Sequence, residues 1–307
     1  MCCLFGMVDY GHHFNGRQKS RMLSILAIEC EERGVDATGV AYNSKGRLRI
    51  YKRPLPAHKL HFSVPNDARV IMGHTRMTTQ GSEKKNYNNH PFLGMAGNMP
   101  FALAHNGVLY NDLTLRKHQK LPKTKIETDS YIAVQLLEKR RVLDLASLKA
   151  MAEKVEGSFT FTVLDGKDTL SFVKGDNPLC LVYFPKVGIY LYASTEAILS
   201  RAVKRMGLPL GQPEKIEVEC GELLQLALDG AITRGEFEPT GIYGRQYRLW
   251  GYMPYCTPYS SKGNEEYVAQ LKSMANSFGY TSGAIDRMLR HGFTLDEIEE
   301  FLYCGEV

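Results

Sequence analysis

Apolar and polar positions alternate along residues 2–245 with two different periods, which together predict a mixture of strands and helices. Residues 2–8 begin as an apolar strand. Residues 19–33 carry apolar side chains at helical spacing, and Gly34 is expected to end that helix. The segments ARVIMGHTR and FALAHNGVL are apolar runs that end in polar residues, a pattern typical of buried strands that stop at a turn. Further short strands are predicted at residues 39–42, 48–52, 158–164, 169–174, 179–184, 189–194 and 222–228.

Three later segments repeat apolar side chains at helical spacing. The first is Asp129–Lys139, for which Thr128 is the expected N-cap. The others are residues 145–155 and 196–205. Clusters of strands separated by helices predict packed layers of sheet and helix. A strict βαβ alternation is absent, which disfavours a doubly wound parallel fold.

The composition changes after about residue 245. Residues 246–264 are rich in Pro, Gly, Ser and Tyr, and they are interpreted as a linker between a domain at residues 2–245 and a small helical tail at residues 265–307. The tail is either an interaction module or a stabilising cap. Its apolar stripes are Leu271, Met274 and Ala275, then Ile285, Met288 and Leu289, and finally Leu295, Ile298, Phe301 and Leu302.

Charge and composition argue against several classes of protein. The net charge of +5, from 38 basic and 33 acidic residues, is small and spread along the chain, which is weak support for nucleic acid binding. No apolar run approaches the roughly 18–20 residues of a membrane span, and the N-terminus lacks the pattern of a secretory signal. The seven cysteines form no CxxC pair and no zinc-like cluster. We therefore expect a cytoplasmic protein that needs no metal or cofactor.

Cys2 is the first candidate for chemistry. Processing removes an initiator methionine when the next side chain is small, so Cys2 is expected to become the first residue. Its thiol and its free α-amino group, with a pKa of about 8, would then share one residue. A nucleophile beside its own base is the arrangement of N-terminal nucleophile hydrolases. Taken alone, a cysteine at this position is more often incidental.

Three other motifs offer complementary groups. Arg76 ends a buried strand and is suited to bidentate carboxylate binding, although it could also be a surface ion-pair partner. Asn106 and Gly107 supply a side-chain amide and a backbone N–H, as an oxyanion hole requires, although His-Asn-Gly is also a common turn. Asp129 could accept hydrogen bonds from an ammonium group, or serve only its helix N-terminus. Together with Cys2, these groups define a site for an amino-acid amide.

At these residues the chain resembles the class II glutamine amidotransferases, whose glutaminase domain has an N-terminal nucleophile (Ntn) fold. The family opens Cys-Gly-(Ile/Leu)-(Phe/Ala/Val)-Gly, and this chain opens Cys2-Cys3-Leu4-Phe5-Gly6. The segments ERGVDATG, GHTR, NNHPF, HNG and ETDS follow in the family's order. The resemblance covers about residues 2–235. It implies an α+β fold, a four-layer αββα Ntn-hydrolase sandwich, to which the tail adds a small C-terminal helical extension.

The resemblance also assigns roles to individual residues. It implies that Cys2 is the nucleophile and that Asn106 and Gly107 form the oxyanion hole. Arg76 would bind the α-carboxylate of the substrate, and Asp129 its α-amino group. The residues implied to shape the rest of the pocket are His90, Thr79, Arg33 and Gly34.

Two positions depart from the family pattern. Cys3 stands where glycine is usual, and Met77 replaces an aromatic residue that often follows the arginine. If residues 2–8 form a strand, Cys3 points to the opposite side from Cys2.

The implied reaction is glutamine hydrolysis. Cys2 attacks the side-chain amide, ammonia leaves, and water releases glutamate from a γ-glutamyl thioester. The chain contains no recognisable synthase domain, so we expect the ammonia to pass to a synthase on another chain, with the C-terminal helices as a candidate contact. Two alternatives stay open: a stand-alone amidohydrolase acting on a γ-glutamyl compound, and a catalytically silent binding or regulatory protein on the same fold.

Overall fold

The computed structural model describes residues 2–242 and 280–290, together with single helical positions at 268, 271–272, 275, 295, 298 and 301–302. The chain forms two compact units, Met1–Gly251 and Tyr252–Val307, and each is described by itself. The predicted linker at residues 246–264 lies outside the described residues.

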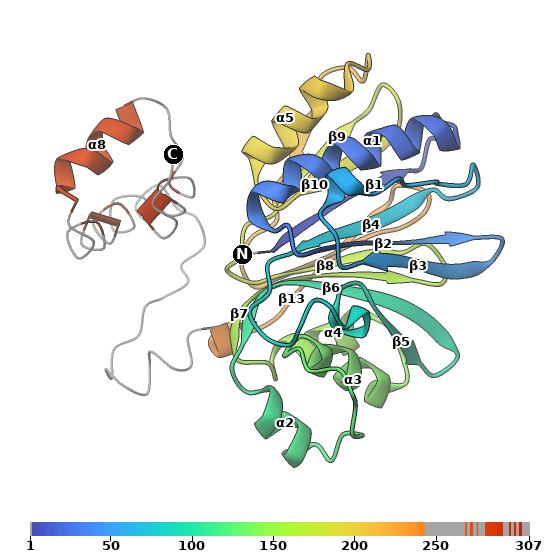
Figure 1. Cartoon of the computed structure of the whole chain (residues 1–307), viewed down its shortest axis with the longest axis vertical. Helices are drawn as coiled ribbons and strands as arrows, with labels where there is room; N and C mark the ends of the chain where they lie inside the picture. Colours follow the sequence, from blue (N-terminus) through green and yellow to red (C-terminus); the bar gives the residue numbers. More distant parts are fainter. Residues whose placement is uncertain are drawn as a thin grey trace. The chain divides into compact units, whose positions relative to one another are not determined.

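Two antiparallel sheets form the larger unit (Figure 1). In spatial order, the strands of the first sheet are β11 (Glu214–Ile216), β9 (Cys180–Phe184), β10 (Ile189–Ala193), β1 (Cys3–Asp9), β4 (Val70–Arg76), β2 (Ala37–Ser44) and β3 (Arg47–Arg53). Those of the second sheet are β13 (Ile232–Glu236), β12 (Glu222–Leu226), β8 (Leu170–Lys174), β7 (Gly157–Asp165), β6 (Met99–Leu109) and β5 (Phe92–Ala96).

Helices cover the outer faces of both sheets. The α-helices of this unit include α1 (Gly16–Glu29), α2 (Asp112–His118), α3 (Tyr131–Arg140), α4 (Leu145–Ala152) and α5 (Glu196–Met206), and its 3₁₀ turns include η1 (Cys30–Arg33), η2 (Ala57–Lys59) and η3 (Asn86–Asn88). Helices α1 and α5 pack on the first sheet, and α3 and α4 pack on the second (Figure 1). This order of layers confirms the predicted αββα sandwich.

Strand β1 shows how side-chain alternation builds the layers. Phe5 and Met7 pack against the helices on the outer face of the first sheet. Leu4 and Val8 point the other way, into the apolar layer between the two sheets. Because the side-chain period of a strand is two residues, one short segment contributes to two cores.

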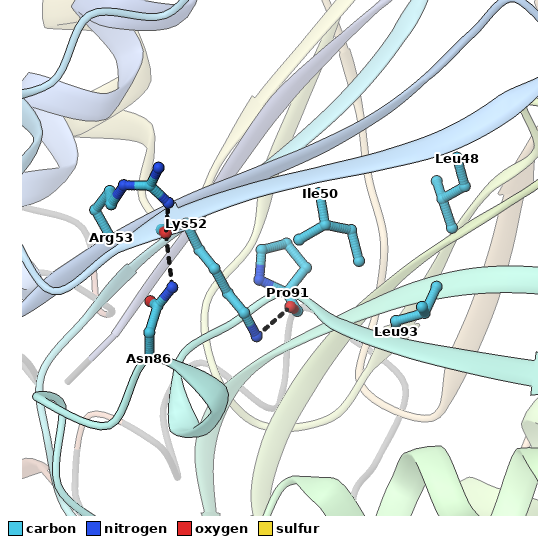
Figure 2. A pocket seen from close by; sticks show the side chains of 7 residues that line it. All are labelled: Leu48, Ile50, Lys52, Arg53, Asn86, Pro91 and Leu93. Carbon is cyan, nitrogen blue, oxygen red and sulfur yellow. Dashed lines mark hydrogen bonds between the residues drawn. The ribbon is translucent and has the colours of Figure 1, made fainter.

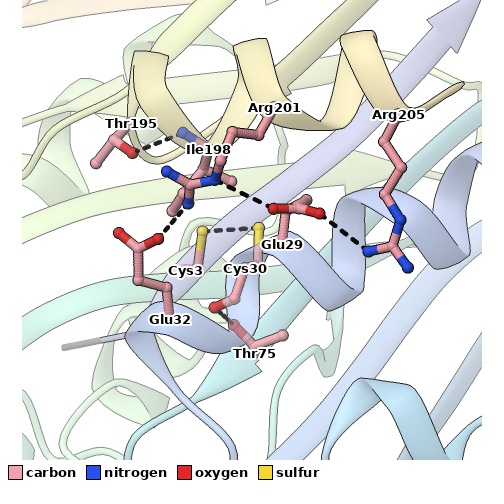
Figure 3. Close-up of polar contacts among 9 residues, drawn as sticks. All are labelled: Cys3, Glu29, Cys30, Glu32, Thr75, Thr195, Ile198, Arg201 and Arg205. Atoms are coloured by element: carbon pink, nitrogen blue, oxygen red, sulfur yellow. Dashed lines mark hydrogen bonds and ion pairs between the residues drawn. The ribbon is translucent and has the colours of Figure 1, made fainter. Parts of the chain in front are cut away.

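Helices α1 and α5 lie side by side and are linked by ion pairs as well as apolar contacts. Glu29 accepts hydrogen bonds from Arg201 at 3.2 Å and from Arg205 at 3.0 Å (Figure 3). Both arginines are about half exposed. Exposed pairs of this kind contribute little stability, so the apolar layer beneath them holds the helices in place.

Several predicted boundaries differ from the structure. The first helix begins at Gly16 because Asn15 and Gln18 form a capping box. The same predicted helix changes into η1 at Cys30, and Gly34 follows in extended conformation rather than as a left-handed cap. Thr128 is not an N-cap, since α3 begins at Tyr131 and its N-cap residue makes no side-chain hydrogen bond to the helix. The sequence interpretation also missed α2, β5, β11 and β13.

The smaller unit contains α8 (Ser282–Arg290) and one apolar cluster. Its buried members are Leu271, Ala275, Ile285, Ile298 and Leu302, which come from all three predicted stripes. Among the described residues of the whole chain, no helix is long and apolar enough to cross a bilayer.

A hydroxyl group anchors the start of β1. The Leu4 N–H donates to the Ser194 Oγ at 2.8 Å, and both residues are buried. Ser194→Ala should lower the free energy of unfolding by about 1–3 kcal/mol, because it leaves a buried N–H without an acceptor. Urea unfolding of Ser194→Ala and of the control Ser24→Ala, whose hydroxyl donates within α1, checks this. Equal stability of both variants would contradict it.

Candidate active site

The predicted site residues Arg76 of β4 and Asn106 of β6, and Cys2 just before β1, lie on the inner faces of the two sheets, at one end of the sandwich. Leu4 pairs with His74 in the first sheet. The His74 Nε2 donates across to the carbonyl oxygen of His105 in the second sheet, at 2.9 Å. Burial lowers the pKa of His74 to about 3, so the ring is neutral when it makes this bond. The bond joins the sheets two residues from Arg76 and one residue from Asn106.

Cys2 lies just before β1 and is 9% exposed. The Met77 N–H donates to its Sγ at 3.4 Å, and its carbonyl oxygen accepts from the Arg33 Nε at 3.1 Å. Cys2 is therefore held through its backbone by η1 and through its sulfur by the residue after β4.

Opposing effects act on the Cys2 thiol. Burial raises the pKa of the thiol, while the Met77 hydrogen bond and the nearby Arg76 guanidinium lower it. The Asp129 carboxylate raises it further. Burial has the largest effect, so at neutral pH the thiol needs a base before it can act as a nucleophile.

Asn106 is a predicted site residue whose polar side chain has no partner in the described protein. It is completely buried in β6, yet neither atom of its amide has a hydrogen-bond partner within the described protein. A buried amide without partners is costly unless a ligand satisfies it. Gly107 follows with φ of 139°, and a Cβ there would lie 2.0 Å from the carbonyl oxygen of Ser158, so this position requires glycine.

Arg76 is buried and held in a defined orientation. It donates to the Asn89 Oδ1 at 2.6 Å and to the carbonyl oxygens of Gln80 and Gly81 at 2.6 and 3.1 Å. These three bonds use three of the five N–H donors of a guanidinium. The donors that remain are the Nε–H and one Nη1 hydrogen, which can hydrogen-bond to an anionic ligand.

Asp129 is buried on the segment before α3. Its Oδ2 accepts the Leu109 N–H at 2.6 Å, and its Oδ1 has only a long contact of 3.4 Å with the Ser130 hydroxyl. The carboxylate thus holds the end of β6, and its Oδ1 is the oxygen better placed to accept a further donor.

The remaining predicted residues lie at different depths. The backbone of Gly34 packs against that of Arg76, so a Cβ there would lie 2.5 Å from the Arg76 carbonyl carbon. His90 is buried, its ring centroid lies 4.3 Å from that of His74, and neither ring nitrogen has a hydrogen-bond partner among the described residues. Burial lowers the pKa of His90 well below its usual value. Thr79 is exposed in the loop after β4.

Sequence interpretation missed the residues that support this arrangement. Asn89 holds Arg76, His74 joins the sheets, and Asp36 accepts the Thr78 N–H at 2.7 Å beside the site. All three lie inside motifs that were singled out for other residues. Their contacts join segments that are far apart in the sequence. The motifs therefore did not predict these contacts.

Away from Cys2, the described residues form a cavity but no metal-binding group. No group of three or more His, Cys, Asp or Glu side chains among them could hold a metal ion. A cavity of about 390 Å³ is lined by residues of β3, η3 and β5 and by Pro91 (Figure 2). Its lining includes none of the predicted site residues. Lys52, in its wall, donates to the carbonyl oxygens of Pro91 and of Asn89, the residue that holds Arg76.

Known proteins share this fold and these motifs. Residues 74–200 match the family described as "Glutamine amidotransferase domain". The glutamine–fructose-6-phosphate aminotransferase (isomerizing) of Sulfurisphaera tokodaii is 30% identical over 191 residues, which are 59% of this chain and 31% of that protein. The 7-cyano-7-deazaguanine synthase of Sulfolobus acidocaldarius is 25% identical over 206 residues, which are 64% of this chain and 43% of that protein. The chain thus spans less than half the length of these relatives.

A further glutamine amidotransferase of known structure shares the fold. The glutamine phosphoribosylpyrophosphate amidotransferase of B. subtilis, solved with ADP and GMP, superposes with a TM-score of 0.60 at 20% identity, over 77% of this chain and 49% of that one. Fold and family match together show that this chain carries a class II glutamine amidotransferase domain of the Ntn type.

Cys3 has a different environment from Cys2. It is fully buried in the layer between the first sheet and its helices, and its Sγ lies 2.9 Å from the Cys30 Sγ (Figure 3). The position that is usually glycine in the family is filled here by a core side chain.

Cys3→Gly should therefore destabilise the domain without removing the Cys2 thiol. The loss of a buried side chain and the added glycine flexibility should cost about 1–3 kcal/mol of unfolding free energy. Urea unfolding measures this cost, and the labelling rate of Cys2 by a glutamine-like electrophile should stay within about twofold of the wild type. A variant that is as stable as the wild type, or that no longer labels, would contradict the core assignment.

Proposed function

We propose that this domain hydrolyses the side-chain amide of glutamine, with Cys2 as the nucleophile. The observation that carries the proposal is the buried Asn106 amide without a protein partner, beside Gly107 and on the inner faces that also bring Arg76 toward Cys2. Two donors beside a thiol are suited to a carbonyl carbon that becomes tetrahedral.

The reaction begins with transfer of the thiol proton. Burial raises the pKa of the Cys2 thiol, so the attack needs a base. The α-amine of Cys2, free once Met1 is removed, accepts the proton through a water molecule. The sulfur then forms a bond to the amide carbon, and the carbonyl electron pair moves to the oxygen.

The oxyanion hole and the substrate clamp have separate roles. The Asn106 Nδ2 and the Gly107 N–H stabilise the oxyanion. Arg76 binds the α-carboxylate with its remaining N–H donors, and the Asp129 Oδ1 accepts from the α-ammonium group. The protonated amine donates to the leaving nitrogen, ammonia departs, and water hydrolyses the γ-glutamyl thioester to glutamate.

The ammonia acceptor is proposed to lie in a different domain or chain. The two curated relatives are named as an aminotransferase and a synthase, and each is more than twice as long as the part that matches this chain. Residues 265–307 are the candidate contact for such a synthase. Stimulation of glutamate release by a co-purifying synthase would separate this proposal from a stand-alone hydrolase of γ-glutamyl compounds.

Covalent labelling tests the nucleophile. Intact-mass measurement after treatment with diazo-oxo-norleucine should show a chain that lacks Met1 and carries one adduct, on Cys2, since this thiol is the proposed nucleophile. Cys2→Ala should lose both the adduct and glutamate release. The control Cys220→Ala, which removes a more exposed cysteine, should keep both. An adduct on a chain that retains Met1, or on another cysteine, would overturn the mechanism.

Removal of one oxyanion donor tests the geometry. Asn106→Ala should lower kcat for glutamine hydrolysis by about 10²–10³-fold, with a much smaller change in KM, because the amide acts mainly on the transition state. Asn111→Ala, just beyond the same strand, should stay close to the wild type. Steady-state glutamate release gives both constants, and a kcat for Asn106→Ala within a few fold of the wild type would exclude this role.

A further inference from the structure

Lys52 is a half-buried lysine of β3 that none of the assigned roles uses. Its Nζ reaches between the sheets and donates to the carbonyl oxygens of Asn89 at 2.5 Å and Pro91 at 3.0 Å (Figure 2 shows the contact with Pro91). The same ammonium lies 5.0 Å from the centroid of the Phe92 ring. One cation therefore fixes the backbone on both sides of His90.

That backbone also carries the partner of Arg76. The Asn89 Oδ1 accepts from Arg76 at 2.6 Å, while the Asn89 carbonyl accepts from Lys52. Asn86 completes the link. Its amide donates to the Lys52 carbonyl at 2.9 Å (Figure 2). The Asn86 Oδ1 accepts from the Asn89 Nδ2 at 3.3 Å. One of the three hydrogen bonds that orient the Arg76 guanidinium is thus connected to β3 through Asn89.

We propose that Lys52 is a positioning residue for substrate binding, which holds Asn89 so that Arg76 presents its remaining N–H donors to the glutamine α-carboxylate. This role rests on the proposed glutaminase function of the site. Lys52 acts through Arg76 and contacts neither the reacting amide nor the nucleophile.

The charge of Lys52 matters because its acceptors are neutral carbonyl groups, which bind an ammonium more strongly than an amine. Burial and then Arg76 lower the pKa of Lys52 to about 8. The other titratable groups that act with it are the imidazoles of His74 and His90, both neutral because burial lowers their pKa values. The neighbouring Arg53 donates to the Lys52 carbonyl oxygen at 2.9 Å. The adjoining cavity lets water and protons reach the amine.

Deprotonation of Lys52 should weaken glutamine binding. Below about pH 8 Lys52 is charged and holds Asn89. Above that pH the neutral amine binds the two carbonyl groups more weakly, and Arg76 loses orientation. The KM for glutamine should therefore rise above pH 8, whereas kcat should change little from this cause, because the oxyanion donors are on β6.

The experiment compares Lys52→Met, Lys52→Arg and the control Arg53→Met with the wild type, using steady-state glutamine hydrolysis from pH 6.5 to 9.5. Lys52→Met should raise KM about tenfold at pH 7, with kcat within about twofold, as expected for loss of a supporting contact. Lys52→Arg, which keeps its charge throughout, should restore KM and remove the rise that the wild type shows above pH 8. Arg53→Met should behave as the wild type.

Several results would overturn the role of Lys52 or the proposed function. A lower melting temperature of Lys52→Met with an unchanged KM would make Lys52 merely structural and overturn the proposal, as would a wild-type KM that rises equally in Lys52→Arg. A wild-type protein that neither hydrolyses glutamine nor labels at Cys2 would instead overturn the proposed function. Calorimetric titration with glutamate then decides the Lys52 role separately, since weaker binding by Lys52→Met, restored in Lys52→Arg, needs no turnover. If Lys52→Met does not fold, the pH comparison of Lys52→Arg with the wild type decides the matter.

Discussion

The hydrogen bond from His74 to the carbonyl oxygen of His105 is the contact on which the site depends. It joins the two sheets at the end of the sandwich where Cys2 lies, and it links β4 of one sheet to β6 of the other. A charged imidazole would be costly in this apolar layer, and the low pKa of His74 keeps the ring neutral. With that distance set, strand alternation directs Arg76 and Asn106 into the same space, although they belong to different sheets.

The polar groups of the site differ in how completely the protein satisfies them. Arg76 has three hydrogen bonds to a side chain and two backbone carbonyls, and Asp129 already holds a backbone N–H. Asn106 has no partner on either amide atom. The groups assigned to substrate charges are thus held before substrate arrives, whereas the group assigned to the transient oxyanion is left unsatisfied. This division suits a site that recognises an amino acid and stabilises a short-lived charge.

The sequence allowed the fold class and the site motifs to be predicted, because strand ends rich in Asn, Gly, His and Arg are visible locally. It also predicted that Cys2 and Cys3 face opposite sides, since the strand period is two. The Thr128 cap was wrong because a tertiary contact, from Asp129 to Leu109, shapes the start of α3. Asn89 and Lys52 could not be found, because their roles depend on carbonyl groups brought together only by folding. The short strands β11 and β13 carry too few apolar residues for a period to be recognised.

The adjacent cysteines have a genetic consequence. Deletion of either one yields the same shortened sequence, Met-Cys-Leu-Phe-Gly, so a single remaining thiol would have to serve both positions. If β1 keeps its pairing, that thiol occupies the core position beside Cys30 and the proposed nucleophile is lost. If the strand slips by one residue, the thiol returns to the inner face, but every following side chain changes sides and the Phe5 ring enters the space between the sheets. A one-codon deletion in this doublet therefore cannot be neutral, even though a cysteine still follows the first methionine.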